Sequence, residues 1–183
     1  MADERQQRRF REMIVPHLDA ALSLARWLTG DPADAEDVVQ DACLRAYNAI
    51  HQCAGENPRG WLLAIVRNSA FSWIARNRPK MMIVTEDIET LEHSNSIALE
   101  REPTPEAVLI AKADAAMLRE AIGRLPIAYR EVLVLREFQE LSYREIADIA
   151  RVPIGTVMSR LARGRALLIA DIDRWQRETE GSS

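Results

Sequence analysis

The 183-residue sequence predicts an all-α fold made of two small helical domains joined by a flexible linker. Apolar residues recur at steps of three and four along most of the chain, which is the spacing of one helix face. Three N-cap residues are each followed by proline, a pair typical of helix starts, at Asp31-Pro32, Asn57-Pro58 and Thr104-Pro105. No segment shows the sustained alternation that a half-buried strand would give.

The N-terminal domain, residues 1–79, is expected to contain three helices with short connections. The first ends at Gly30, because glycine readily closes a helix C-terminus. Asp31 and Asn57 cap the second and third helices, and Pro79 closes the third. The expected helices span about Phe10–Leu28, Pro32–His51 and Pro58–Asn77.

The expected linker covers residues 80–104, where the helical periodicity is lost and acidic side chains gather. Residues 81–117 carry eight acidic and only two basic side chains. The C-terminal domain, residues 105–183, is expected to open with a helix that starts at Pro105. A break at Pro126 precedes a fifth helix that carries Val132 and Phe138.

The C-terminal domain is predicted to be a helix-turn-helix over about Ser142–Arg165. Ser142 and Glu145 form a capping box at the start of its first helix, and a turn at about Arg151–Gly155 follows. The second helix has an inward apolar face made of Val157, Leu161, Gly164 and Leu168. Its opposite face carries side chains that reach phosphates and base edges in a major groove, namely Thr156, Ser159, Arg160 and Arg163. A helical hairpin with merely solvated arginines is the alternative.

The distribution of charge supports nucleic-acid binding although the net charge is −4 at pH 7. Residues 57–80 and 149–170 contain basic side chains and no acidic ones. Two such windows predict two DNA-facing surfaces. The chain has only two cysteines, no apolar run of about 18–20 residues and a highly charged N-terminus. These features predict a cytoplasmic protein without membrane insertion.

Four segments resemble, in order and spacing, those of extracytoplasmic-function sigma factors of the sigma-70 family. They are residues 34–46, residues 58–68, Leu125-Pro126 and residues 142–163. The resemblance implies a protein that directs bacterial RNA polymerase core to specific promoters in a stress or envelope response. It implies promoter DNA, the polymerase core and a cognate anti-sigma factor as partners. Residues 10–79 would then serve the promoter −10 element and residues 105–175 the −35 element.

The second helix is expected to dock on the polymerase core. Its acidic residues recur at steps of three and four and therefore share one helix face. A solvated acidic face would be the preferred interpretation without the resemblance. The expected core-binding residues are Asp34, Asp37, Gln40 and Asp41.

The third helix combines aromatic side chains with arginines, which suits single-stranded DNA because bases stack on rings while phosphates attract positive charge. The resemblance implies that this helix and the loop over residues 51–57 recognise and open the −10 element. Trp61 fits the packed face of the helix equally well, and Ser72 stands where the family often has aspartate. The expected residues are Arg59, Trp61, Arg67, Asn68, Ser72, Trp73, Arg76 and Arg78.

The helix-turn-helix is expected to read the −35 element. Whether each arginine contacts bases or phosphates stays open at this point. By resemblance the DNA-binding residues are Arg144, Ile154, Thr156, Ser159, Arg160 and Arg163.

The sequence suggests no enzyme, cofactor or small-molecule substrate. No phosphate-binding loop, dinucleotide fingerprint or nucleophile elbow is present. His51, Cys43 and Cys53 lack the paired spacing of a zinc site, so no metal is expected. A conventional helix-turn-helix regulator, which would bind specific DNA without polymerase, is the main alternative. The sequence does not favour an enzyme that acts on nucleic acid, because Asp34, Asp37 and Asp41 have no evident catalytic partners.

Overall fold

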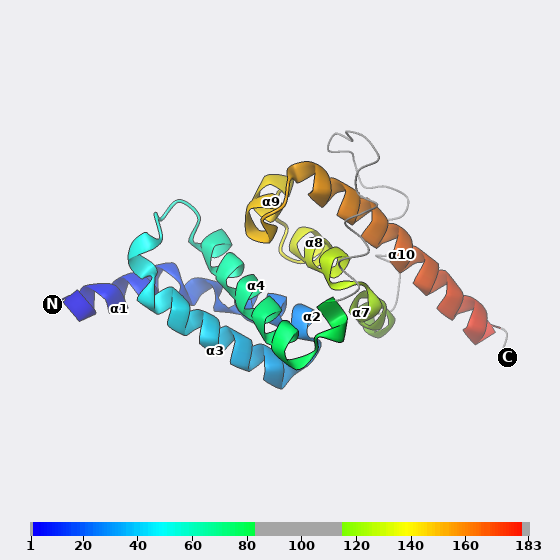
Figure 1. Cartoon of the computed structure of the whole chain (residues 1–183), viewed down its shortest axis with the longest axis horizontal. Coiled ribbons are helices and arrows are strands. Elements are labelled where there is room, and N and C mark those ends of the chain that lie inside the picture. The colour runs from blue at the N-terminus through cyan, green and yellow to red at the C-terminus, as the bar shows by residue number, and fades with distance from the viewer. Residues whose placement is uncertain (1, 83–114, 181–183) are drawn as a thin grey trace.

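The computed structural model describes residues 2–82 and 115–180, and every regular element in these two ranges is helical. The N-terminal unit contains α1 (Ala2–Met13), α2 (Leu18–Thr29), α3 (Pro32–Asn48) and α4 (Pro58–Asn77). The C-terminal unit contains α7 (Ala115–Arg124), α8 (Ile127–Glu137), α9 (Tyr143–Ala150) and α10 (Ile154–Glu180). Figure 1 shows the two units beside one another, with α10 along the outer edge of the C-terminal unit. The all-α prediction is confirmed.

The predicted starts of the second and third helices of the N-terminal unit are confirmed. The Asp31 carboxylate accepts hydrogen bonds from the backbone N–H groups of Ala33 and Asp34 at 2.8 and 3.1 Å. The Asn57 side-chain oxygen accepts from the N–H of Gly60 at 2.8 Å. Both caps satisfy backbone donors that have no partner within the first helical turn. Gly30 closes α2 with a φ of 76°, in the left-handed region that glycine adopts readily.

Three predicted helix boundaries are wrong. The first helix begins at Ala2 and not at about Phe10. The single helix expected over Phe10–Leu28 is divided into α1 and α2 by a 3-10 turn, Val15–His17, that contains Pro16. Proline has no N–H to donate and its ring clashes with the preceding turn, so it ends α1 despite the continuous apolar spacing. The helix expected to reach His51 ends at Asn48, and a second 3-10 turn, Ile50–Gln52, follows.

The helix start expected at Thr104-Pro105 lies outside the described residues, as does most of the expected linker. Of residues 80–104 only 80–82 are described, and they are helical. The break at Pro126 is confirmed, because α7 ends at Arg124 and α8 begins at Ile127.

Each unit has an apolar interior built by its own helices. In the N-terminal unit α2, α3 and α4 pack against one another in pairs. Their fully buried side chains include Leu24, Leu28, Ala42, Leu62 and Val66. In the C-terminal unit α10 packs across α7, α8 and α9. Its predicted inward residues Val157, Leu161 and Leu168 are buried, and a Cβ added at Gly164 would lie 3.4 Å from Tyr129 Cβ on α8.

The two units also pack against each other, through α2 against α8 and α4 against α9. Trp27 of α2 stacks on Phe138 after α8, with ring centroids 4.6 Å apart. Because α8 lies between α2 and α10, all its residues from Ile127 to Leu135 are buried, including two charged ones. The two described units are therefore in direct contact, which the sequence analysis did not predict.

Candidate nucleic-acid interface

The start of the helix-turn-helix is fixed by the predicted capping box. The Glu145 carboxylate accepts from the N–H of Ser142 at 2.9 Å, and the Ser142 hydroxyl oxygen accepts from the N–H of Glu145 at 3.3 Å. The bond from the Ser142 backbone is the main reason that the pKa of Glu145 lies below its ordinary value. The box therefore fixes the residue at which α9 begins.

The first turns of α10 present side chains toward solvent. Ile154 is 47% exposed although it is a large apolar residue. Arg163 is exposed, whereas Thr156 and Ser159 are partly exposed. The Ser159 hydroxyl donates to the Thr156 carbonyl at 3.0 Å, so the two polar residues lie within one turn of each other. Arg144 on α9 is also exposed.

Arg160 does not belong to this exposed face in the structure, contrary to the sequence prediction. Its exposure is 5%, and it is one of the few charged residues that are buried among those described. Its positive charge acts on the Glu131 carboxyl, which it helps to keep ionised. In the packed arrangement of the two units, the Arg160 guanidinium therefore faces the interior and is not open to DNA.

The arginines expected from α4 divide into two groups. Arg59 and Arg67 are partly buried against the C-terminal unit. Arg59 donates to the backbone and side-chain oxygens of Gln139, both at 2.9 Å. Arg67 donates to both oxygens of Glu131, at 2.5 and 3.3 Å, and lies 3.9 Å from the centre of the Phe71 ring.

The second group lies toward the end of α4 and is exposed. Arg76 donates to the Ser72 carbonyl at 3.1 Å, and both residues are exposed. Arg78 bonds the Thr29 carbonyl at 2.8 Å and the Asp34 carboxylate at 3.1 Å. Arg78 also lies 5.4 Å from the centre of the Trp73 ring. The exposed end of α4 is thus positively charged with an aromatic ring beside it.

The two predicted tryptophans and Asn68 lie between solvent and the core. Trp61 and Trp73 are partly buried and pack against the apolar core. Asn68 is partly buried and accepts a long hydrogen bond of 3.4 Å from Arg67. The partial burial of Trp61 is compatible with both interpretations that the sequence left open for it.

The acidic residues of α3 are not equivalent. Asp37 and Gln40 are exposed. The Asp41 carboxylate accepts from the Ser69 hydroxyl at 2.9 Å and from Arg45 at 2.7 Å. Burial alone would raise the pKa of Asp41, but these two hydrogen bonds bring it below the ordinary value. Leu44, which the sequence analysis did not single out, is 63% exposed on the same helix.

The sequence analysis also missed three buried polar residues between the units, Arg130, Glu131 and Gln139. Arg130 donates to the carbonyls of Leu125 and Leu28, at 3.0 and 3.3 Å, and to that of Gly123. Burial lowers the pKa of Arg130 to about 10. An Arg-Glu pair inside the apolar run from Ile127 to Leu135 was the available signal, because charged residues are rarely buried unless they have partners.

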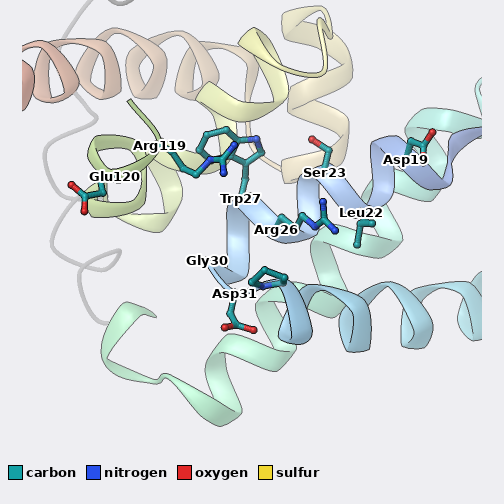
Figure 2. Close-up of a pocket in the computed structure, with 10 residues that line it drawn as sticks. Asp19, Leu22, Ser23, Arg26, Trp27, Gly30, Asp31, Arg119 and Glu120 are labelled. Carbon is teal, nitrogen blue, oxygen red and sulfur yellow. The ribbon is translucent and has the colours of Figure 1, made fainter. Parts of the chain in front are cut away.

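A groove of about 710 Å³ lies where α2 and the start of α3 approach α7. Figure 2 shows its lining, which includes Trp27 and Arg26 from α2 and Arg119 and Glu120 from α7. Because both units supply its walls, the groove exists only while they are packed together.

Metal and membrane features are both missing from the described ranges. Within residues 2–82 and 115–180 no group of three His, Cys, Asp or Glu side chains could hold a metal ion. None of the helices in these ranges is both long enough and apolar enough to cross a bilayer.

Comparison with protein families gives two matches that lie in the two described units. The family described as Sigma-70 region 2 matches residues 13–80, and the family described as Sigma-70, region 4 matches residues 115–168. The first match contains α2, α3 and α4, and the second contains the helix-turn-helix.

Full-length relatives agree with these matches. The RNA polymerase sigma-H factor of Pseudomonas aeruginosa is 33% identical over 163 residues, which are 87% of this chain and 83% of that protein. The ECF RNA polymerase sigma-E factor of Escherichia coli is 32% identical over 162 residues, 87% of this chain and 84% of that one. The ECF RNA polymerase sigma factor SigW of Bacillus subtilis is 30% identical, covering 87% and 86% of the two chains.

Solved structures share the fold. The sigma factor RpoE of Bartonella quintana, in complex with the anti-sigma factor NepR, superposes with a TM-score of 0.64 at 24% identity, covering 90% of this chain and 96% of that one. CnrH in complex with the cytosolic domain of CnrY gives a TM-score of 0.63 at 25% identity, covering 92% and 90%. With relatives above 30% identity along most of its length, this chain belongs to the extracytoplasmic-function RNA polymerase sigma factors of the sigma-70 family.

Proposed function

We propose that this sigma factor directs core polymerase to a bipartite promoter through three separate surfaces. The −35 surface is the start of α10 with Arg144, the −10 surface is α4 with the loop over residues 51–57, and the core-binding surface is the acidic face of α3. The observation that carries the proposal is the solvent-facing set Ile154, Thr156, Ser159 and Arg163 at the start of α10, the helix that follows the capped helix α9. A rigid helix with exposed polar side chains in its first turns suits insertion into a major groove.

The −35 surface is tested by Arg163→Ala in transcription with purified core polymerase from a promoter found by start-site mapping. We expect a loss of about 5- to 150-fold if Arg163 reads a base, because such a contact gives about 1–3 kcal/mol of discrimination. Arg174→Ala is the matched control, since Arg174 is also exposed on α10 but lies beyond the region 4 match. Equal activity of the two variants would contradict the assignment.

The core-binding surface is tested by Asp37→Lys in a competition for core polymerase against the wild-type chain. Asp37 is exposed and its charge would be reversed in the contact, so affinity for the core should fall while the fold is kept. Glu36→Lys is the control, because Glu36 is exposed on the same helix about 100° away from Asp37. A similar loss in both variants would point to net charge and not to this face.

The −10 surface would act on separated strands. Arg76 is exposed, and the ring of Trp73 lies beside the charge of Arg78, a combination that suits stacking with phosphate contact. Trp73→Ala should slow promoter opening, measured by permanganate reactivity of unpaired thymines, while leaving the closed polymerase–promoter complex intact. Unchanged opening would remove Trp73 from this surface.

We further propose that the chain acts in the cytoplasm, has no catalytic activity of its own and binds a protein anti-sigma factor. The two similar solved structures are described as complexes of sigma factors with an anti-sigma factor or with the cytosolic domain of CnrY. Such a partner should compete with core polymerase for this chain. Stable simultaneous binding of both, seen as one complex in gel filtration, would contradict this proposal.

A further inference from the structure

Helix α1 packs against the end of α3 and the loop over residues 51–57, which the proposed function assigns to the −10 element. The side-chain N–H of Gln6 donates to the Tyr47 carbonyl near the end of α3 at 2.8 Å. A Cβ added at Gly55 in the loop would lie 3.6 Å from Met13 Cε at the end of α1. Figure 1 shows α1 and this loop at the same end of the N-terminal unit. The proposed function gives α1 no role, although α1 borders the −10 loop.

A hollow of about 270 Å³ lies where α1 approaches the end of α3 and the start of this loop. Its lining residues are Arg5, Gln6 and Arg9 from α1 and Asn48, Ile50 and His51 from the other side. Every one of them except Ile50 carries a side-chain hydrogen-bond donor, and within the described part of the chain no acidic residue lines the hollow. The two arginines, Asn48 and His51 are exposed, so a ligand can enter from solvent. A concave surface with donors and positive charge but no carboxylate favours an anionic ligand.

The two arginines of the hollow are placed for one ligand. Arg5 and Arg9 are four residues apart on α1 and therefore lie on one helix face. Arg9 donates one guanidinium N–H to the Cys53 carbonyl in the loop, and its guanidinium has further donors for a ligand. Arg5 is exposed and forms no hydrogen bond or ion pair with another described residue. Guanidinium groups bind phosphate and carboxylate oxygens through paired hydrogen bonds, so the ligand carries one of these two groups.

We propose that the hollow binds a backbone phosphate of the single DNA strand whose bases are held by the −10 surface. This inference rests on the proposed function, because the loop over residues 51–57 supplies part of the wall of the hollow and is assigned there to the −10 element. A strand that lies along the loop also lies beside the hollow, where the charges of Arg5 and Arg9 attract its phosphate. Helix α1 thereby extends the −10 surface onto a third element and strengthens binding to the open promoter without reading its sequence.

The test uses the complex of the full chain with core polymerase and a labelled promoter fork, in which the −10 strands are already unpaired. The promoter is one found by start-site mapping, and affinity is measured by fluorescence anisotropy at several salt concentrations. Arg5→Ala should weaken binding by up to about fivefold, the value of one exposed ion pair. The slope of the logarithm of the affinity against that of the salt concentration should become about 0.7 less steep, because one phosphate contact with a single strand is lost.

Arg11→Ala is the matched control. Arg11 is also exposed on α1, but it lies about 120° around the helix from Arg5 and about 160° from Arg9. This variant removes the same charge away from the hollow and should keep the wild-type affinity and salt dependence. Equal affinities and equal salt slopes for Arg5→Ala and Arg11→Ala would overturn the proposal.

Neutral phosphates identify the group that Arg5 contacts. A methylphosphonate, in which a methyl group replaces one charged phosphate oxygen, is placed at each position in turn along each unpaired strand. At one position it should weaken binding by the wild-type complex and have no further effect in Arg5→Ala, because both changes remove the same contact. Losses that add at every position would overturn the proposal and indicate that the hollow binds a carboxylate of a protein partner.

The same fork tests the proposed −10 surface separately. Trp73→Ala should weaken binding to the fork by about 5- to 150-fold, because one base loses its stacking surface. Wild-type binding by Arg5→Ala together with weakened binding by Trp73→Ala would overturn the site on α1 and leave the −10 surface in place. Wild-type binding by both variants would overturn the assignment of the −10 surface as well.

Discussion

The Arg67–Glu131 pair gives a quantitative prediction about folding stability. In Arg67→Met the apolar length of the side chain is kept, but the fully buried Glu131 carboxylate loses its two hydrogen bonds. Removing one partner of a buried ion pair costs about 3–5 kcal/mol, because the remaining charge stays buried without compensation. The nearby charge of Arg160 places the expected loss toward the lower end, about 3 kcal/mol.

The pH dependence of this loss follows from the pKa of Glu131. Burial already raises the pKa of this carboxyl, whereas Arg67 and Arg160 act to lower it, so removal of Arg67 raises it further. A native pKa above the unfolded one means that the native state binds more protons. Stability therefore falls as pH rises from the unfolded value through the native one. The variant should lose less stability at pH 5 than at pH 7.5.

Urea denaturation, followed by far-ultraviolet circular dichroism at both pH values, measures these free energies of unfolding. The double variant Arg67→Met with Glu131→Gln should recover most of the loss and lose the added pH dependence, because no buried charge remains. Arg76→Met, at an exposed position of α4, is the control and should change stability by less than about 0.5 kcal/mol. A loss below about 1 kcal/mol for Arg67→Met, with no added pH dependence, would refute the burial of Glu131 in solution.

Three further predictions concern the C-terminal unit. Ser142→Ala should lower the free energy of unfolding by about 1 kcal/mol, since one half of the capping box is lost. The bonds to Ser142 depress the pKa of Glu145, so the stability from this contact is present above the unfolded pKa and is lost as pH falls through the native pKa. The free energy of unfolding, measured by urea denaturation between pH 6 and pH 3, should therefore decline less steeply in Ser142→Ala than in the wild type. Gly164→Ala should be neutral or stabilising by up to about 1 kcal/mol, because the added Cβ would meet Tyr129 at a contact distance of 3.4 Å. Gly164→Leu should cost about 1–3 kcal/mol, because the larger side chain overpacks the contact between α8 and α10. Equal thermal midpoints for the two variants would contradict the close approach of these helices. Arg151→Gly should stabilise the chain by up to about 1 kcal/mol, because Arg151 adopts a φ of 57° after α9; a lower thermal midpoint would show that its side chain has a structural role.

Local signals in the sequence predicted most of the helix starts correctly. The caps at Asp31, Asn57 and Ser142 depend on hydrogen bonds to residues two or three positions away, so the pattern alone determines them. The division of the first helix at Pro16 was also visible locally. The continuous apolar periodicity favours one helix there, but the missing N–H and the ring of Pro16 end α1.

The burial of Arg160 and the occupation of Arg67 could not be predicted in the same way. Arg67 and Glu131 are 64 positions apart, and their contact depends on how two separately folded units pack. Helical periodicity places Arg160 at the edge of the inward face of α10, three residues after Val157 and four before Gly164, but it does not show that this position is covered. The polar faces of α4 and α10 were recognised from sequence, whereas their partners within the chain required the structure.

The most direct test of the central claim is transcription by purified bacterial core polymerase on a library of genomic fragments, with and without this chain, followed by sequencing of the RNA 5′ ends. We predict new start sites that appear only when chain and core are both present and that share two upstream sequence elements. Those start sites should require Asp37 on α3, and their use should fall for Arg163→Ala. No core-dependent start sites, together with sequence-specific DNA binding by the chain alone, would contradict the account and favour a conventional helix-turn-helix regulator.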